Sequence, residues 1–207
     1  MASVYLVTGR QSKAIELSKQ ISDIQKQKFG DDHYNTLVAL NNLAGTYTAA
    51  GQIEEGIRIL RDVNKLYELK YSEEHPERMR SLSNLGIAYY DAGKLGEAIA
   101  NLSNAGELQK RKLGATHTDT LHTFSNLARV LRATGKVNEA IRLFESVRTQ
   151  QINVLGETHF NTIQTTNNLA EAYRTLGQLP KTVELVESVV HAQVNNFGTE
   201  HPHTLII

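Results

Sequence analysis

Histidine is the residue type in this sequence best suited to hold a metal ion or move a proton, and it recurs at a fixed interval. Five of the eight histidines are spaced 42 residues apart, at His33, His75, His117, His159 and His201. Ligands of one metal ion must lie about 2 Å from it, which side chains a whole repeat apart cannot do. His201 and His203 are near neighbours but lack further ligands. The spacing therefore predicts that each histidine fixes a turn through a hydrogen bond, and predicts no metal site.

Catalytic signatures are missing from the sequence. It contains no glycine-rich phosphate loop with its lysine, no Gly-x-Ser-x-Gly and no His-Glu-x-x-His. The absence of cysteine excludes disulfides and thiolate ligands. Residues that recur with a period are better explained by stacking than by catalysis, because one active site needs unlike groups to converge. We expect no enzyme activity and no cofactor.

Composition restricts the partners and the cellular compartment that we expect for this chain. The 22 basic residues balance the 22 acidic ones, so no overall field attracts nucleic acid or a membrane surface. Apolar runs are too short to cross a bilayer, and the opening MASVYLVTGR lacks the pattern of a signal peptide. The composition favours a soluble, cytoplasmic protein.

The histidine interval belongs to an internal repeat of the whole sequence. Other residue types keep the same 42-residue period, above all glycine (Gly9, Gly51, Gly93, Gly135, Gly177), asparagine (Asn42, Asn84, Asn126, Asn168) and leucine (Leu43, Leu85, Leu127, Leu169). We expect full repeats at 33–74, 75–116, 117–158 and 159–200, a partial repeat at 1–32, and the start of another at 201–207.

Each repeat reads as two amphipathic helices. From Leu37 to Tyr47 the apolar residues have the spacing of one helical face, and a second face runs from Ile53 to Val63. Gly51 between them suits the left-handed residue that ends a helix. One pair cannot bury its own apolar faces, so neighbouring pairs must stack. The predicted fold is an all-α solenoid of antiparallel helix pairs.

The residues Asn84-Leu85-Gly86, Tyr89, Gly93 and Glu97-Ala98 resemble a tetratricopeptide repeat, and the 42-residue period resembles its kinesin-light-chain-like variant. The resemblance covers essentially the whole chain and implies a right-handed superhelix. It departs at four positions: Leu131 replaces the tyrosine, Gly56 and Thr182 replace a small alanine, and Lys181 replaces an acidic residue. Gly56 within a helix should cost roughly 1 kcal/mol relative to alanine.

The resemblance also implies a function. Tetratricopeptide arrays bind peptides in a concave groove lined by the first helix of each pair. The asparagine column can pair with a peptide N–H and C=O together; alternatively, it braces the neighbouring helices. The groove residues that we expect from these columns are Asn42, Arg80, Asn84, Ile87, Tyr90, His122, Asn126, Arg129, Arg132, Asn167, Asn168, Glu171 and Arg174.

Charge in this groove suggests its ligand. Its arginines outnumber Asp91 and Glu171, which favours an extended acidic peptide with an aromatic anchor, unless the arginines only pair with neighbouring glutamates. We expect a protein–protein interaction module. The alternative is a sensor or docking arm for a kinase or NTPase domain of the same parent chain. RNA binding is a remote third class, because the net charge is zero and Tyr90 is the one groove aromatic.

The two ends of the sequence lie inside repeats. By the period, Ala2, Tyr5 and Gly9 belong to the end of a first helix, and His201 opens another. We therefore expect a fragment of a larger protein. The ends carry apolar residues that a neighbouring repeat would cover, which predicts weak end-to-end self-association. These residues are Val4, Leu6, Val7, Leu205, Ile206 and Ile207.

Overall fold

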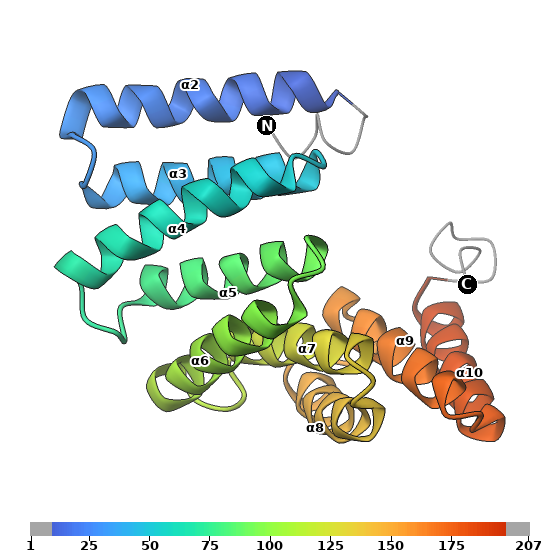
Figure 1. Ribbon diagram of the computed structural model, residues 1–207. Coiled ribbons are helices and arrows are strands. Elements are labelled where there is room, and N and C mark those ends of the chain that lie inside the picture. Colours follow the sequence, from blue (N-terminus) through green and yellow to red (C-terminus); the bar gives the residue numbers. More distant parts are fainter. Residues whose placement is uncertain (1–9, 198–207) are drawn as a thin grey trace. The chain divides into compact units, whose positions relative to one another are not determined.

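The computed structural model describes residues 10–197, and in that range the chain forms nine α helices and no strand. It divides into two compact units, residues 1–112 and 113–207. The first unit holds α2 (Gln11–Phe29), α3 (Tyr34–Ala49), α4 (Ile53–Lys70), α5 (Pro76–Asp91) and α6 (Leu95–Leu113), and the second holds α7 (Thr118–Ala133), α8 (Val137–Leu155), α9 (Phe160–Thr175) and α10 (Leu179–Phe197) (Figure 1). The prediction of an all-α helical-repeat solenoid is confirmed. The termini, with the apolar residues expected to mediate self-association, lie outside the described residues.

Histidine begins three of the first helices of the repeats. The Nδ1 atoms of His33, His117 and His159 each accept a hydrogen bond at 3.2 Å from the backbone N–H two residues later. Each histidine is thus an N-cap, which satisfies an N–H that the helix itself leaves without a partner. The predicted structural role of these three is confirmed.

His75 is the exception among the described histidines of the 42-residue column. Its ring lies 4.6 Å from that of Tyr71 and 6.1 Å from that of Tyr67, and it makes no capping bond. Pro76 follows it at the first position of α5, and the His75 ring accepts no bond from the N–H of Glu77, which stands where the capped N–H stands in the other repeats. Tyr67 and Tyr71 occupy columns that hold glutamine and leucine in the next repeats, so the packing of two tyrosines on the histidine is not repeated there.

A glycine ends each first helix in the described repeats. Gly51 has φ +81°, and Gly93, Gly135 and Gly177 have similar positive values. After α3 the N–H of Gly51 bonds Thr48 O at 3.0 Å and the N–H of Gln52 bonds Tyr47 O at 2.9 Å. This is the Schellman arrangement, which a residue with a Cβ adopts only at a cost.

Successive first helices contact each other through polar side chains. In the first unit Asn84 Nδ2 on α5 donates to Asn41 Oδ1 on α3 at 3.4 Å. In the second unit the hydroxyls of Ser125 on α7 and Thr165 on α9 lie 3.1 Å apart. The apolar columns on the other faces of the helices are buried. Leu37 in α3 and Phe144 in α8, for example, are both 0 % exposed.

Gly56 lies where α4 packs closely on α3. A Cβ at this position would stand 2.4 Å from Thr48 Oγ1 and 2.9 Å from Ala44 O. The expectation that alanine would be the better residue here is therefore wrong. Glycine costs helix propensity, but it permits a closer approach of the two helices than any other residue would.

Candidate functional site

In the first unit, the predicted groove residues lie along one face of α3 and α5. Asn42 and Arg80 are exposed, whereas Asn84, Ile87 and Tyr90 are half-buried. Arg80 forms an ion pair with Glu77 one turn earlier in α5. Its charge is thereby neutralised on its own helix, so this face carries little excess positive charge.

In the second unit, α7 and α9 form the equivalent face. His122, Asn167 and Arg174 are exposed, while Arg129, Arg132, Asn168 and Glu171 are half-buried and Asn126 is buried. The structure therefore brings all the predicted groove residues of this unit onto two adjacent helices.

Glu171 is the acidic residue of this face with which two of its arginines pair. Its carboxylate accepts two hydrogen bonds from Arg174, at 2.8 Å from Nε and 2.6 Å from the terminal nitrogen. Arg132 of α7 approaches the same carboxylate to 3.6 Å and so links the two helices. The hydrogen bonds from Arg174 hold the pKa of Glu171 below its ordinary value, with the charges of Arg174 and Arg132 acting in the same direction. One carboxylate therefore faces two guanidinium groups.

Asn126 is occupied within its own helix. Its Nδ2 donates to His122 O at 3.1 Å, and its Oδ1 accepts from Arg129 at 3.0 Å. It is 8 % exposed. The four asparagines of this column therefore differ in their side-chain hydrogen bonds. Asn84 and Asn126 are bonded to neighbouring residues, whereas within the described range no side-chain hydrogen bond is made by Asn42 or Asn168.

His122 sits beside Asn126 at the start of this face. It is exposed overall, but desolvation of its ring lowers its pKa; the Asp119 charge acts against this and the Arg129 charge with it. At neutral pH it is an uncharged hydrogen-bonding group, so the positive charge of the face comes from its arginines.

A second feature, which the sequence analysis missed, is a hollow of about 400 Å³ between α8 and α10 with α9 as its floor. Tyr173 on the floor donates a hydrogen bond to Glu145 of α8. Lys181 of α10 lies 4.6 Å from the centre of the Tyr173 ring and 3.4 Å from its hydroxyl. The lining residues are Glu145, Arg148, Thr149, Leu169, Tyr173, Lys181, Glu184 and Leu185.

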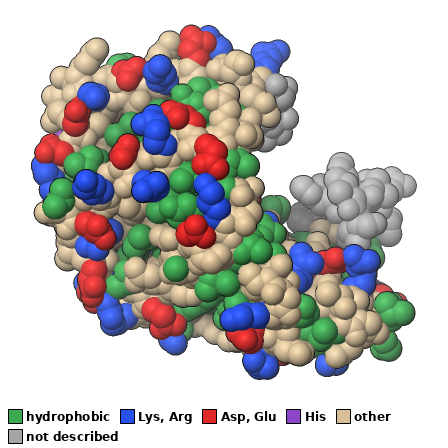
Figure 2. Space-filling view, in the orientation of Figure 1, with side chains coloured by type: hydrophobic (Ala, Val, Ile, Leu, Met, Phe, Trp, Pro, Cys, Tyr) green, Lys and Arg blue, Asp and Glu red, His purple; other side chains and the backbone are tan. Residues whose placement is uncertain are grey.

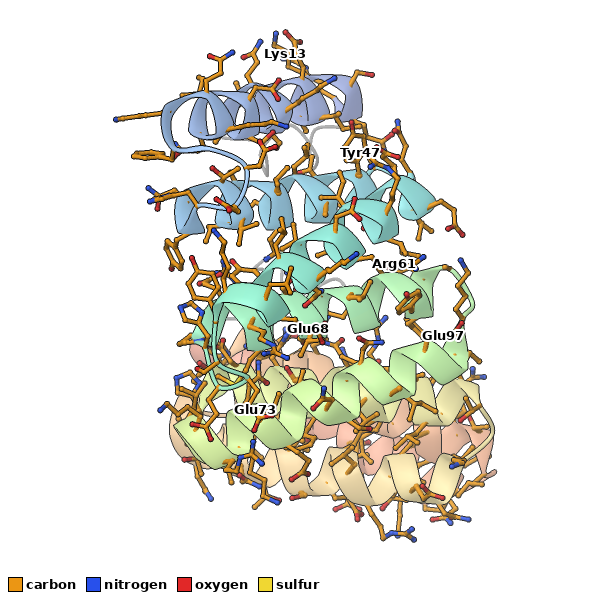
Figure 3. The ribbon with its side chains drawn as sticks, turned by 60° about the vertical axis from the view of Figure 1, so that its left-hand side comes forward. Lys13, Tyr47, Arg61, Glu68, Glu73 and Glu97 are labelled. Atoms are coloured by element: carbon orange, nitrogen blue, oxygen red, sulfur yellow. The ribbon has the colours of Figure 1, made fainter. Side chains whose placement is uncertain are left out.

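A matching hollow of about 360 Å³ lies in the first unit between α2 and α4, over α3. It is built from the same repeat columns, with Tyr47 in the place of Tyr173. Lys19 of α2 lies close enough to Glu55 of α4 for its charge to help lower the pKa of that carboxyl, after the stronger effect of the hydrogen bond from Arg58. Figure 3 labels Tyr47 near the C-terminal end of α3.

The two hollows have inverted charges at three corresponding columns. Lys19, Glu55 and Arg58 of the first unit correspond to Glu145, Lys181 and Glu184 of the second. The departure at Lys181 is thereby explained, because Glu145 on the preceding second helix has changed sign with it. A comparison of the columns across repeats could have revealed this pairing from sequence alone.

Other kinds of site are not seen in the part of the chain that the structure describes. Within residues 10–197 no three His, Asp or Glu side chains gather as metal ligands would, and none of the helices is long and apolar enough to cross a membrane. On the face seen in Figure 2, basic and acidic side chains are interspersed.

Comparisons with known proteins agree with this geometry. The family model for the tetratricopeptide repeat matches residues 1–69, 39–105, 77–149 and 119–192. The chain belongs to the tetratricopeptide repeat family. A comparison with curated proteins found no match.

Solved structures with the same fold include other tetratricopeptide arrays. One is a Podosopora anserina chain assigned as a kinesin light chain, whose tetratricopeptide-like repeats are nearly identical to one another. It is 31 % identical to this chain, with 95 % of this chain and 93 % of that chain covered and a TM-score of 0.77. BtubC (BKLC) from P. vanneervenii is 19 % identical over 97 % of this chain and 80 % of its own, with a TM-score of 0.79. A Rap protein complexed with Competence and Sporulation Factor is 13 % identical over 94 % of this chain and 62 % of its own, with a TM-score of 0.61.

Membership of this family makes the chain a protein–protein interaction module. Such scaffolds are generally not enzymes, because they present repeated surfaces rather than a single cluster of unlike reactive groups. The question that remains is which surface of the tetratricopeptide array receives a partner, and what chemistry that surface selects.

Proposed function

We propose that the face of α7 and α9 binds an extended, acidic segment of a partner protein. The observation that carries this proposal is the cluster in which Arg132 and Arg174 share the single carboxylate of Glu171. Asn126 holds Arg129 beside this cluster. With His122 uncharged, Arg132 and Arg174 place two positive charges against the one negative charge of Glu171.

A carboxylate on the partner could join this cluster without removing Glu171. Arg174 is 64 % exposed, and a guanidinium presents five N–H donors, of which Glu171 uses two. Arginine binds carboxylates in a planar, two-bonded geometry that favours acidic over neutral side chains. The face of α3 and α5 lacks this excess, since Glu77 pairs with Arg80.

Asn168 supplies the backbone contact in this proposal. Its amide can pair with a peptide N–H and C=O together, and no other described side chain or backbone group holds it. Asn126 acts differently: it holds Arg129 in position. In this proposal Asn42 is the equivalent free amide of the first unit, and Asn84 braces α3.

The test uses the full chain and fluorescence anisotropy. The probe is a labelled library of short acidic peptides, each with one aromatic residue. A matched library replaces Asp and Glu by Asn and Gln. We expect the acidic library to bind, and its affinity to fall as salt rises from about 0.05 to 0.5 M, because ions screen charges over roughly 10 Å at 0.1 M. Equal binding of both libraries would contradict the acidic preference.

Variants locate the binding face. Arg174→Gln and Asn168→Ala should each weaken binding several-fold. Both should leave the free energy of unfolding within about 0.5 kcal/mol of the wild-type value, since both side chains are peripheral to the core. Arg80→Gln is the matched control on the other unit and should leave binding unchanged. If Arg80→Gln weakens binding and Arg174→Gln does not, the partner binds elsewhere.

A further inference from the structure

Three departures from the repeat pattern line one hollow, the one between α8 and α10. Lys181 stands in a column that holds glutamate in the three preceding repeats, and Glu145 stands in one that holds lysine, arginine and serine there. Arg148 stands in a column that is buried and uncharged in those repeats. Stacking needs similar residues in every repeat, so unlike groups that converge in one repeat indicate a site.

Arg148 and Thr166 have exchanged sizes relative to the other repeats. The Nε of Arg148 donates to Thr166 Oγ1 of α9 at 3.0 Å, and Thr166 is 3 % exposed. In the three preceding repeats the second-helix column is small or neutral and the first-helix column is large and apolar; the pairs are Ser22 with Leu40, Asn64 with Leu82, and Gly106 with Phe124. The exchange introduces a half-buried guanidinium, which costs free energy unless a partner neutralises it.

The charged groups of this hollow are only partly paired. Among the described residues Arg148 makes no hydrogen bond or ion pair besides the bond to Thr166, so its two terminal nitrogens are available. Glu184 on the facing wall of α10 likewise has no such partner in residues 10–197, although its charge helps to raise the pKa of Tyr173. If these charges served only to join α8 to α10, Arg148 and Glu184 would pair with each other.

This hollow is separate from the peptide face of the same unit. Its two walls, α8 and α10, both pack on α9 (Figure 1). Tyr173 on its floor follows Glu171 of the peptide face by two residues, which places the two side chains about 200° apart around α9. A ligand in the hollow therefore does not compete with a peptide on the other side of α9.

We propose that the hollow between α8 and α10 binds a free α-amino acid with an apolar side chain. The ligand's carboxylate accepts hydrogen bonds from the terminal nitrogens of Arg148, because a guanidinium binds a carboxylate in a planar, two-bonded geometry. Its ammonium faces the carboxylate of Glu184, and its side chain lies against Leu169 and Leu185, which line the same hollow.

Charge and size both favour this class of ligand. A molecule with both charges satisfies the two facing walls together, whereas an anion or a cation alone leaves either Glu184 or Arg148 without a partner. The volume of about 400 Å³ is near the lower end of the range of small-molecule sites, about 300–1,000 Å³, and so suits a ligand of few atoms.

The hollow of the first unit does not offer the same chemistry. Ser22 stands in the position of Arg148, and Leu40 stands in that of Thr166. The guanidinium that this hollow does contain, Arg58, pairs with Glu55 and Asp62 of its own helix. We therefore expect one binding site in the described part of the chain, in the second unit.

Isothermal titration calorimetry of the full chain tests the proposal. The probes are L-leucine and L-phenylalanine, together with N-acetyl-L-leucine, which lacks the ammonium, and L-leucinamide, which lacks the carboxylate. We expect both amino acids to bind at one site and each derivative to bind about tenfold more weakly or worse, because each loses a charged hydrogen bond. No binding of either amino acid at about 10 mM, or equal binding of either derivative, would overturn the proposal.

Variants locate the site. Arg148→Gln and Glu184→Gln should each weaken the binding of L-leucine about tenfold. Glu184 is exposed, so its variant tests the site without risk to the fold. Lys19→Gln, in the hollow of the first unit, is the matched control and should bind as the wild type does. Binding that survives both changes in the second unit, or that is equally weakened by Lys19→Gln, would overturn the assignment. Neither residue lies on the face of α7 and α9, so both variants should bind the acidic peptide library normally.

Discussion

The hydroxyl of Tyr173 donates a hydrogen bond to the carboxylate of Glu145 and so joins α9 to α8. The ammonium of Lys181 stacks on the same ring from α10. One side chain thus connects three successive helices of the second unit. Tyr173 is 6 % exposed and closes the floor of the hollow between α8 and α10.

This arrangement predicts a loss of stability at alkaline pH. Burial, the bond to Glu145 and nearby carboxylates raise the pKa of Tyr173 from 10.0 to about 12. The unfolded chain ionises its tyrosine first, so the contribution is complete below about pH 10 and is lost as the pH rises through 12. Between about pH 9 and pH 11.5, the free energy of unfolding of Tyr173→Phe should fall less than that of the wild type. If the free energies of unfolding of the two proteins fall in parallel as the pH rises, the raised pKa of Tyr173 is contradicted.

Charge exchange across the same hollow gives a second prediction. Lys181→Glu places a carboxylate beside Glu145 and should cost about 1 kcal/mol, which lowers the unfolding midpoint by roughly 2–4 °C in a chain of this size. Adding Glu145→Lys restores opposite signs in the sense of Lys19 and Glu55 and should recover part of the loss, because the double variant still lacks the acceptor of the Tyr173 hydrogen bond. The measurement is thermal unfolding of the two single variants and the double variant. Additive losses would show that these charges do not interact.

Gly56 gives a third prediction that opposes helix propensity. Gly56→Ala forces a methyl group to within 2.9 Å of Ala44 O and 2.4 Å of Thr48 Oγ1, and we expect a net loss of about 1–2 kcal/mol. Gly96→Ala is the matched control, because it also lies within a helix and a Cβ there meets nothing within 4 Å. Its free energy of unfolding should rise by up to about 1 kcal/mol. Equal and stabilising effects at both glycines would exclude the close contact.

Much of the fold was predictable from sequence because its determinants are local and periodic. The glycine after α3 and the capping histidine before it act on residues within a few positions of themselves, so Gly51 and His33 could be assigned without a structure. The exceptions depend on neighbours that are distant in sequence or on a choice of rotamer. His75 makes no cap and lies against Tyr67 and Tyr71, and Gly56 is required because Thr48 approaches it.

The candidate site was predictable to a smaller extent. The columns placed its residues on the correct helices, but they could not show which polar groups were already occupied. Arg80 could equally have pointed to solvent, and its pairing with Glu77 is a property of side-chain conformation. Likewise, nothing in the repeated Asn-Leu pattern distinguishes the bonded Asn126 from Asn168.

That distinction gives the last prediction. Asn126→Ala removes a buried amide that bonds both His122 O and Arg129, and should cost about 1–3 kcal/mol because Arg129 loses an acceptor in a half-buried place. Asn168→Ala, the same change in the same column of the next repeat, should cost less than about 0.5 kcal/mol, since no hydrogen bond to another described residue is lost. Chemical denaturation of the two variants measures both costs. If the two are equal, the column has one structural role throughout, and Asn168 cannot be the free amide that the proposed peptide contact requires.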